Sequence, residues 1–318
     1  MESSKKFDKN NVEKVLRDNF TKLMPTFYEM ESSFLSGVYR RYGDLEGGNI
    51  VIYFARDLHL EILRKREVDL DFDLSLDMFW NNHKDIRQGK KKIILVSKET
   101  GLPKETTRRK IISLIRKKHL KKEEKNRLYW EPASEHKETY LRIIGEQINS
   151  LSKFILEQTK LFNSPIPLSR IEREIKKNYS FYWYHYLTVQ LQYIRFWHGR
   201  LNDLEMLLIG LQSIIQTVNF LKKTENYQNK NQKNFDSKKA NISATSVSEV
   251  TGIPRATCIR KLEKFVKMKV LEKDLESKRY SLKLNQTTLN PMLDGDWFKQ
   301  KISIVSEFSS VVMKGLFR

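Results

Sequence analysis

The sequence predicts a mostly α protein with short β-hairpins, built from two repeated domains. Three observations predict this fold class. The 318 residues include only seven Pro and twelve Gly, which favours helices over a sheet-rich architecture. Hydrophobic residues make up 39% and aromatic residues 11% of the chain, enough for a core and too many for a disordered protein. The length suits two domains, and the chain aligns with itself.

The internal alignment is clearest in two basic segments. Residues 96–130 align without gaps with residues 247–281 at a constant offset of 151, and twelve of the 35 pairs are identical. The identical pairs include Thr100/Thr251, Gly101/Gly252, Pro103/Pro254, Thr106/Thr257 and Arg109/Arg260. Apolar residues also replace apolar residues throughout. Because identity and hydrophobic phase persist together, we interpret the two segments as a duplication.

A weaker match continues upstream, with small insertions. Residues 12–20 match 171–179, and Phe27-Tyr28 matches Phe181-Tyr182. Each copy opens with a possible N-cap, Asn10 followed by Glu13 and Ser169 followed by Glu172, which predicts a helix start in both. The repeated unit therefore has a helical front part, a variable connection and a basic back part.

These matches set the expected domain boundaries. Residues 1–134 form the first unit, with its basic segment at about 87–131, and residues 135–168 a helical connector. Residues 169–290 form the second unit, with its basic segment at about 240–286, and residues 291–318 a C-terminal amphipathic helix. That helix could close the second core or pair with another chain.

The aromatic-rich residues 179–198 are interpreted as core, with a small-ligand pocket as the alternative.

The charge of the chain is concentrated in the same two segments. The formal net charge is +20. Residues 87–127 carry +12, residues 238–283 carry +7, and the rest of the chain carries only +1. Such concentration is expected of surfaces that bind a polyanion.

The second basic segment shows the elements of the unit in order. Residues 246–251 have the apolar spacing of a short helix, which Gly252-Ile253-Pro254 should end in a tight turn. From Arg255 to Lys269, apolar residues recur at helical spacing and predict one buried stripe. Residues 270–273 and 279–284, separated by a polar stretch, predict a β-hairpin.

Helix, glycine turn, helix and hairpin, found in both copies, resemble the winged helix-turn-helix module of many bacterial transcription regulators. The resemblance covers roughly 80 residues in total. It implies a mostly α fold with small β-wings, in which each of two repeated domains is a helical bundle plus a winged helix-turn-helix. Both copies depart from the usual pattern after the second helix, where Lys118 and Lys269 stand in place of Gly.

The resemblance also implies which residues contact double-stranded DNA. The second helix of such a module enters the major groove, where Arg, Lys and Thr read base edges. The residues expected on that helix are Lys104, Thr106, Thr107, Arg108 and Arg109 in the first copy, and Arg255, Thr257, Cys258, Arg260, Lys261 and Lys264 in the second. Other basic residues are expected to hold phosphates. They are Lys125, Arg127, Lys278 and Arg279 on the wings, and Lys117 and Lys118 after the second helix of the first copy.

The expected function is sequence-specific DNA binding by a transcription regulator, acting as a monomeric pseudo-dimer or a homodimer. Because Glu105 aligns with Ala256 and Arg108 with Ile259, the preferred site should be an imperfect palindrome. One alternative is a replication initiator of plasmid or phage type. Another is a structural or assembly protein that uses winged helices to grip protein partners.

Several other classes are not expected. The single cysteine excludes a disulfide framework and a multi-thiolate metal site. Cys258 lies beside two arginines and could be a redox sensor, but because Thr107 is its equivalent in the first copy we favour a small tolerated residue. Residues 69–73 begin like a calcium loop, but Leu74 stands where Gly is needed. No catalytic motif, cofactor motif or signal peptide is found, and residues 204–221 contain Glu205, Gln212, Gln216 and Asn219, too many polar groups for a membrane span. The protein is expected to be a cytoplasmic non-enzyme, nucleoid-associated when bound, with no membrane span, cofactor or metal and with any effector unknown.

Overall fold

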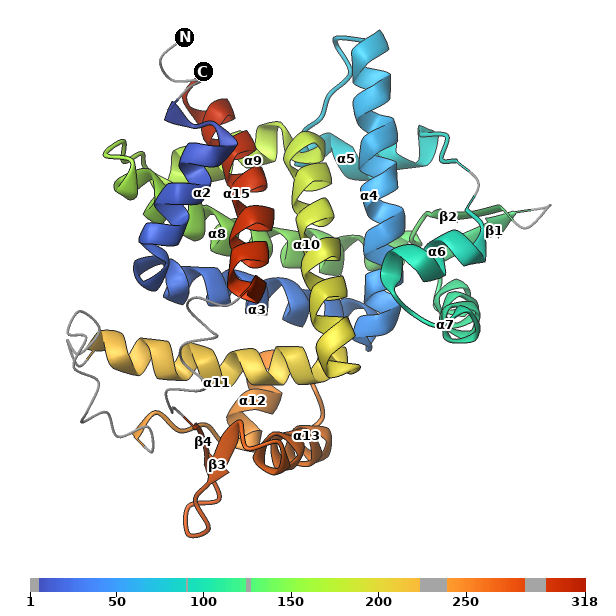
Figure 1. The fold of residues 1–318 in the computed structure, drawn as a ribbon. Helices are drawn as coiled ribbons and strands as arrows, with labels where there is room; N and C mark the ends of the chain where they lie inside the picture. The colour runs from blue at the N-terminus through green and yellow to red at the C-terminus, as the bar shows by residue number, and fades with distance from the viewer. Residues whose placement is uncertain (1–5, 90, 124–126, 224–238, 284–295) are drawn as a thin grey trace.

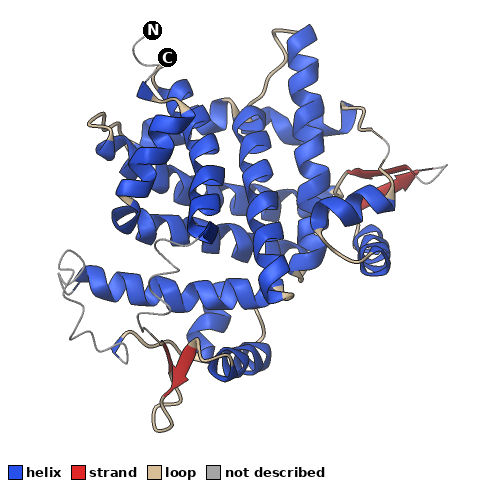
Figure 2. Cartoon of the chain, in the orientation of Figure 1, coloured by secondary structure: helices blue, strands red, loops and turns tan. Residues whose placement is uncertain are grey.

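The computed structural model describes residues 6–318 except 90, 124–126, 224–238 and 284–295 (Figure 1). The described chain is dominated by helices, with two small antiparallel two-stranded sheets (Figure 2). The prediction of a mostly α protein with short hairpins is therefore confirmed.

The first half runs through α2 (Lys9–Asp18), α3 (Phe20–Tyr42), α4 (Leu45–Val68), α5 (Leu76–Asn82), η1 (His83–Asp85), α6 (Ile93–Thr100), α7 (Lys104–Arg116), β1 (Leu120–Glu123), β2 (Arg127–Trp130), η3 (Ser134–His136) and α8 (Lys137–Leu161). The second half runs through α9 (Leu168–Lys177), α10 (Tyr179–Leu201), α11 (Leu204–Lys223), α12 (Ala244–Thr251), α13 (Arg255–Lys267), β3 (Leu271–Lys273), β4 (Tyr280–Leu282) and α15 (Asp296–Leu316).

The helix bounds of the two halves recur at constant offsets. Helices α2 and α3 correspond to α9 and α10 at an offset of 159 at both ends, and the starts of α4 and α8 correspond to those of α11 and α15 at the same offset. Helices α7 and α13 correspond at an offset of 151 at both ends. With this offset of 159, Phe27 of the first half is equivalent to Tyr186 of the second. The sequence match of Phe27-Tyr28 to Phe181-Tyr182 is therefore out of register.

The predicted helix starts are also wrong in detail. Helix α2 is capped by Asp8, whose Oδ1 accepts hydrogen bonds from the backbone N–H groups of Asn10 and Asn11 at 2.9 and 3.0 Å. Helix α9 begins after Pro167 without a side-chain cap. Proline suits this position because it has no N–H group to satisfy.

The long helices of the two halves interlock. Helix α4 packs along α10, and α11 packs along α3. The third helix of each half therefore covers the second helix of the other half. Equivalent ring contacts join the halves, with Phe34 5.3 Å from Tyr186 and Phe27 6.3 Å from Tyr193 between ring centroids. At the centre, Gln190 donates a 3.0 Å hydrogen bond to Glu31, and these two residues are themselves related by the offset of 159.

The C-terminal helix lies within this bundle. Helix α15 packs against α2 and α10, and ring contacts join Phe298 to Phe20 at 5.0 Å and Phe308 to Tyr186 at 5.4 Å. This helix was expected either to close a core of its own chain or to pair with another chain. In the structure α15 packs into the core of its own chain. Most of the aromatic-rich segment 179–198 is also buried, as predicted.

Helix α11 crosses the bundle beside the second hairpin (Figure 1). By length and composition alone it could span a membrane, a test that core helices also pass. Here just over half of its apolar window is buried inside the protein, where α11 packs along α3.

Candidate nucleic-acid interface

Two basic modules stand out from the helical bundle. The first basic module comprises α6, α7, β1 and β2, and the second comprises α12, α13, β3 and β4 (Figure 1). In each, an eight-residue helix, a glycine turn and a thirteen-residue helix precede an antiparallel hairpin.

The turns of the two modules are built from the same bonds. Gly101 and Gly252 take φ angles of +74° and +78°, a conformation that glycine adopts without strain. The hydroxyls of Thr100 and Thr251 each donate a 2.7 Å hydrogen bond to the carbonyl four residues earlier. The first helix of each module therefore ends in the same way, with a threonine bonded back to its own helix and a glycine after it.

Lys118 and Lys269 explain the departure seen in the sequence. Both follow the second helix and take the left-handed conformation, with φ angles of +56° and +60°. The next backbone N–H groups, of His119 and Val270, bond back to Leu114 and Phe265 at 2.9 and 3.0 Å. The backbone therefore makes the glycine-type turn with lysine, at a cost of about 1 kcal/mol.

The second helix of each module presents a basic face to solvent. Lys104, Arg108 and Arg109 are exposed on α7, and Arg255, Arg260 and Lys264 are exposed on α13. Thr106 and Thr257 are half-buried at the edge of this face. Among the described residues, neither Arg109 nor Arg260 has an ion-pair partner, whereas Arg108 is paired with Glu105 at 2.9 Å.

Two of the expected contact residues point inward instead. Thr107 and Cys258 are fully buried. The Thr107 hydroxyl donates to the Pro103 carbonyl at 3.0 Å, and the Cys258 thiol donates to the Ile253 carbonyl at 3.5 Å. Burial raises the pKa of Cys258 to about 11, so the thiol is not activated as a redox sensor would need. Both residues fasten the second helix to the turn, and their assignment to the interface is wrong.

Lys261 is a third correction. Its side chain is buried, and its Nζ lies 2.6 Å from Asp203 Oδ1 and 2.8 Å from Glu205 Oε2 at the start of α11. The equivalent Lys110 lies 2.8 Å from Asp44 and 3.1 Å from Glu46 at the start of α4. Each module is thus clamped to the bundle by one lysine and two carboxylates.

The wings and helix ends give a mixed result. Arg127 is half-buried and donates to the Gln88 carbonyl, so the structure contradicts its assignment as an exposed wing contact. Lys125 lies outside the described residues. Lys278 and Arg279 are exposed, with Arg279 bonded to Asn241 at 3.0 Å. After α7, Lys117 and Lys118 are exposed, and Lys118 lies 3.4 Å from Glu135.

One further pair of equivalent basic residues is exposed on the two second helices. Arg116 and Lys267 are exposed at the last position of α7 and α13. They are an equivalent pair in the alignment, so the sequence contained a signal for them. The acidic half of the clamp also recurs in the sequence, as Asp44-Leu45-Glu46 and Asp203-Leu204-Glu205, but only the structure shows that a lysine of each module lies against it.

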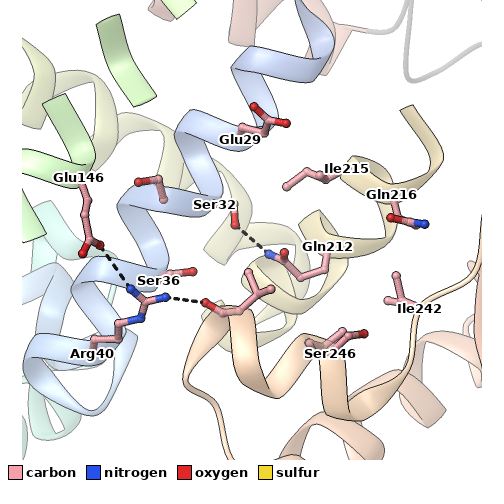
Figure 3. Close-up of a pocket in the computed structure, with 13 residues that line it drawn as sticks. Glu29, Ser32, Ser36, Arg40, Glu146, Gln212, Ile215, Gln216, Ile242 and Ser246 are labelled. Carbon is pink, nitrogen blue, oxygen red and sulfur yellow. Dashed lines mark hydrogen bonds and ion pairs between the residues drawn. The ribbon is translucent and has the colours of Figure 1, made fainter. Parts of the chain in front are cut away.

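Figure 3 shows how the second module meets the bundle. A cavity of about 420 Å³ opens between α3, α11 and α12. Beside it, Arg40 on α3 reaches Glu146 on α8 at 3.4 Å and donates to the Val250 carbonyl on α12 at 2.9 Å. Deeper in, Gln212 donates to the Ser32 hydroxyl at 2.9 Å. One arginine thus joins three helices across the two halves.

The turns of the two modules abut equivalent positions near the ends of the long helices. Gly101 lies against His198 near the end of α10, and Gly252 lies against Tyr39 near the end of α3. Because Tyr39 and His198 are related by the same offset as the front helices, the turn of each module touches the opposite half in an equivalent way, while the lysine clamp holds the module to its own half. No protein-family model, curated protein or solved structure matches this chain. Within the described ranges, no three His, Cys, Asp or Glu side chains gather as a metal site would need.

Proposed function

We propose that this protein binds double-stranded DNA sequence-specifically and acts as a transcription regulator in the cytoplasm. The two basic modules act as winged helix-turn-helix domains, and α7 and α13 enter the major groove. The observation that carries the proposal is the pair Arg109 and Arg260. They occupy equivalent exposed positions on equivalent helices, without ion-pair partners in the described structure.

The proposed base-reading set consists of exposed basic residues near the start of each second helix and of the half-buried threonine at the edge of the same face. It comprises Lys104, Thr106 and Arg109 on α7, and Arg255, Thr257 and Arg260 on α13. Arginine can bond bidentately to guanine, and each such contact contributes about 1–3 kcal/mol of discrimination. Eight other exposed basic residues are assigned to phosphates, namely Arg108, Arg116, Lys117, Lys118, Lys264, Lys267, Lys278 and Arg279.

The chain is further proposed to act as a pseudo-dimer. Each half contributes one module, and the turn of each module touches the opposite half at an equivalent position. Two modules related in this way would address successive major grooves, about 10 bp apart. Because Arg108 is held by Glu105 while the second module has Ile259 and Ala256 at those positions, the two half-sites should differ.

The proposal is tested by selecting bound duplexes from a random library with the full chain. The double variant Arg109→Ala/Arg260→Ala should lose the selected motif and weaken specific binding by at least tenfold. The matched control Arg64→Ala/Arg173→Ala removes two exposed arginines outside the modules and should leave both unchanged. An unaltered motif in the first variant would show that other residues read the bases.

Salt dependence tests the alternative of a protein-docking module. A protein that neutralises several phosphates shows a steep fall in affinity for DNA with salt. Binding to random duplex with little or no salt slope would overturn the proposal.

A further inference from the structure

The second half contains an apolar pocket that is nearly closed in the first. The second-half pocket lies between α10, α11 and the second basic module and has a volume of about 290 Å³. The corresponding cavity of the first half has a volume of about 20 Å³. Because α3 and α4 correspond to α10 and α11, the first half serves as an internal reference for the second.

The two cavities share their walls. Tyr193, Trp197 and Arg200 of α10 line the second-half pocket, and their equivalents on α3, Phe34, Val38 and Arg41, line the small cavity. The same offset relates Gly210, Leu211 and Ile214 of α11 to Val51, Ile52 and Ala55 of α4. The pocket is therefore an opened version of a site that both halves have.

At two positions the first half carries the larger side chain, whereas Trp197 and Ile214 of the second half are larger than their equivalents Val38 and Ala55. Tyr42 and His119 pack edge to face at 4.9 Å, and the equivalent residues of the second half are the smaller Leu201 and Val270. Arg41 also fills space, because its guanidinium stacks over the rings of Tyr42 and Tyr140 at 4.8 and 4.4 Å.

In the second half the equivalent arginine lies on the surface. Arg200 is exposed, stacks over the Phe196 ring at 3.6 Å and donates to the Phe196 carbonyl at 3.0 Å. Within the described residues it has no ion-pair partner. The pocket thus combines apolar walls with one arginine whose guanidinium can donate further hydrogen bonds. This composition suits a ligand with an apolar body and one anionic group.

We propose that the second-half pocket binds a small apolar molecule that carries one carboxylate. The apolar part fills the space beside Trp197 and Ile214, and the carboxylate pairs with Arg200 at the mouth. Burial of apolar surface supplies most of the affinity, and the planar guanidinium selects an anion over a neutral or cationic analogue.

The pocket also touches the DNA-reading part of the chain. Phe265 and Met268 lie at the end of α13, and Val270 and Leu271 lead into the second hairpin, and all four line the pocket. A bound carboxylate contacts both the bundle and the second module and so changes how that module is held. This regulatory consequence rests on the proposed function, whereas ligand binding itself does not.

Calorimetry on the full chain without DNA tests the site with three matched probes: 1-naphthaleneacetate, the neutral 1-naphthaleneethanol and the cationic 1-naphthaleneethylamine. We expect saturable binding of the acid, at least tenfold tighter than that of the alcohol, and weakest binding of the amine. Arg200→Gln should abolish the preference for the acid, Ile214→Trp should abolish binding of the acid, and the matched surface control Arg195→Gln should change neither.

Two results would overturn the proposal. One is equal affinity of the acid and the alcohol in the unchanged protein. The other is no saturable binding of any probe, as expected if the chain's own residues occupy the pocket. Arg200 lies at the surface, so Arg200→Gln remains informative even if Ile214→Trp does not fold. DNA affinity with and without 1-naphthaleneacetate is measured separately, so failure of DNA binding and failure of ligand binding are distinguishable.

Discussion

Two lysines on one helix should respond to substitution in opposite ways. Lys261 and Lys264 are one helical turn apart on α13, but the Lys261 side chain is 9% exposed and bound to Asp203 and Glu205, whereas Lys264 is exposed. We expect Lys261→Ala to lower the free energy of unfolding. Lys264→Ala should instead leave stability unchanged and weaken DNA binding.

The magnitudes follow from burial. Removing one partner of a fully buried ion pair costs about 3–5 kcal/mol. The Asp203 and Glu205 side chains are 24% and 26% exposed, so water can solvate the carboxylates that remain. We therefore expect Lys261→Ala to lower the free energy of unfolding by about 2 kcal/mol, below that range. For Lys264→Ala the change should stay within about 0.5 kcal/mol, as for most surface substitutions.

Urea denaturation measures the first quantity, and DNA affinity at several salt concentrations measures the second. If Lys264 holds a phosphate, its loss should lower the slope of log affinity against log salt by about 0.9. Lys261→Ala, assayed where it is fully folded, should keep the parent slope. Parent-like stability together with a reduced slope for Lys261→Ala would refute the clamp and return Lys261 to the interface.

Three further predictions concern buried or strained positions. Because burial raises the pKa of Cys258 to about 11, its thiol should react with a thiol reagent only after the protein unfolds. Threonine occupies the equivalent position 107, so Cys258→Thr should change the free energy of unfolding by less than about 1 kcal/mol. Burial raises the pKa of Glu31 to about 8, while the pKa of the neighbouring Lys301 is lowered by burial to about 7. From pH 5 to 7 the folded protein keeps a proton on Glu31 that the unfolded chain releases, so this group makes stability fall as pH rises, by up to about 1.4 kcal/mol per pH unit. Glu31→Gln should remove that fall in denaturation curves, and an unchanged pH slope would contradict the assignment. Finally, Lys118→Gly and Lys269→Gly should each raise the free energy of unfolding by up to about 1 kcal/mol, which would appear as a higher urea midpoint. A lower midpoint would show that the lysine side chains stabilise the turn.

The sequence by itself determined the features that depend on local chemistry. Gly101 and Gly252 mark turns because few other residues take a positive φ angle without strain. The apolar spacing within each second helix determined which stripe is buried, and the alignment of the basic segments located equivalent elements. Arg109 and Arg260 could be placed on the exposed face for the same reason, since helical periodicity assigns faces without knowledge of the partner.

The tertiary structure alone decided which polar residues leave that face and where a site opens. Lys261 is buried because Asp203, 58 positions earlier in the chain, lies against it, and helical periodicity does not reveal such a partner. The register of the front helices also required the structure, because a bundle rich in aromatic residues allows several plausible matches. The second-half pocket depends on side-chain volumes contributed by separate elements, such as Leu201 and Val270 in place of Tyr42 and His119. Packing between distant segments, rather than any local pattern, determines these features.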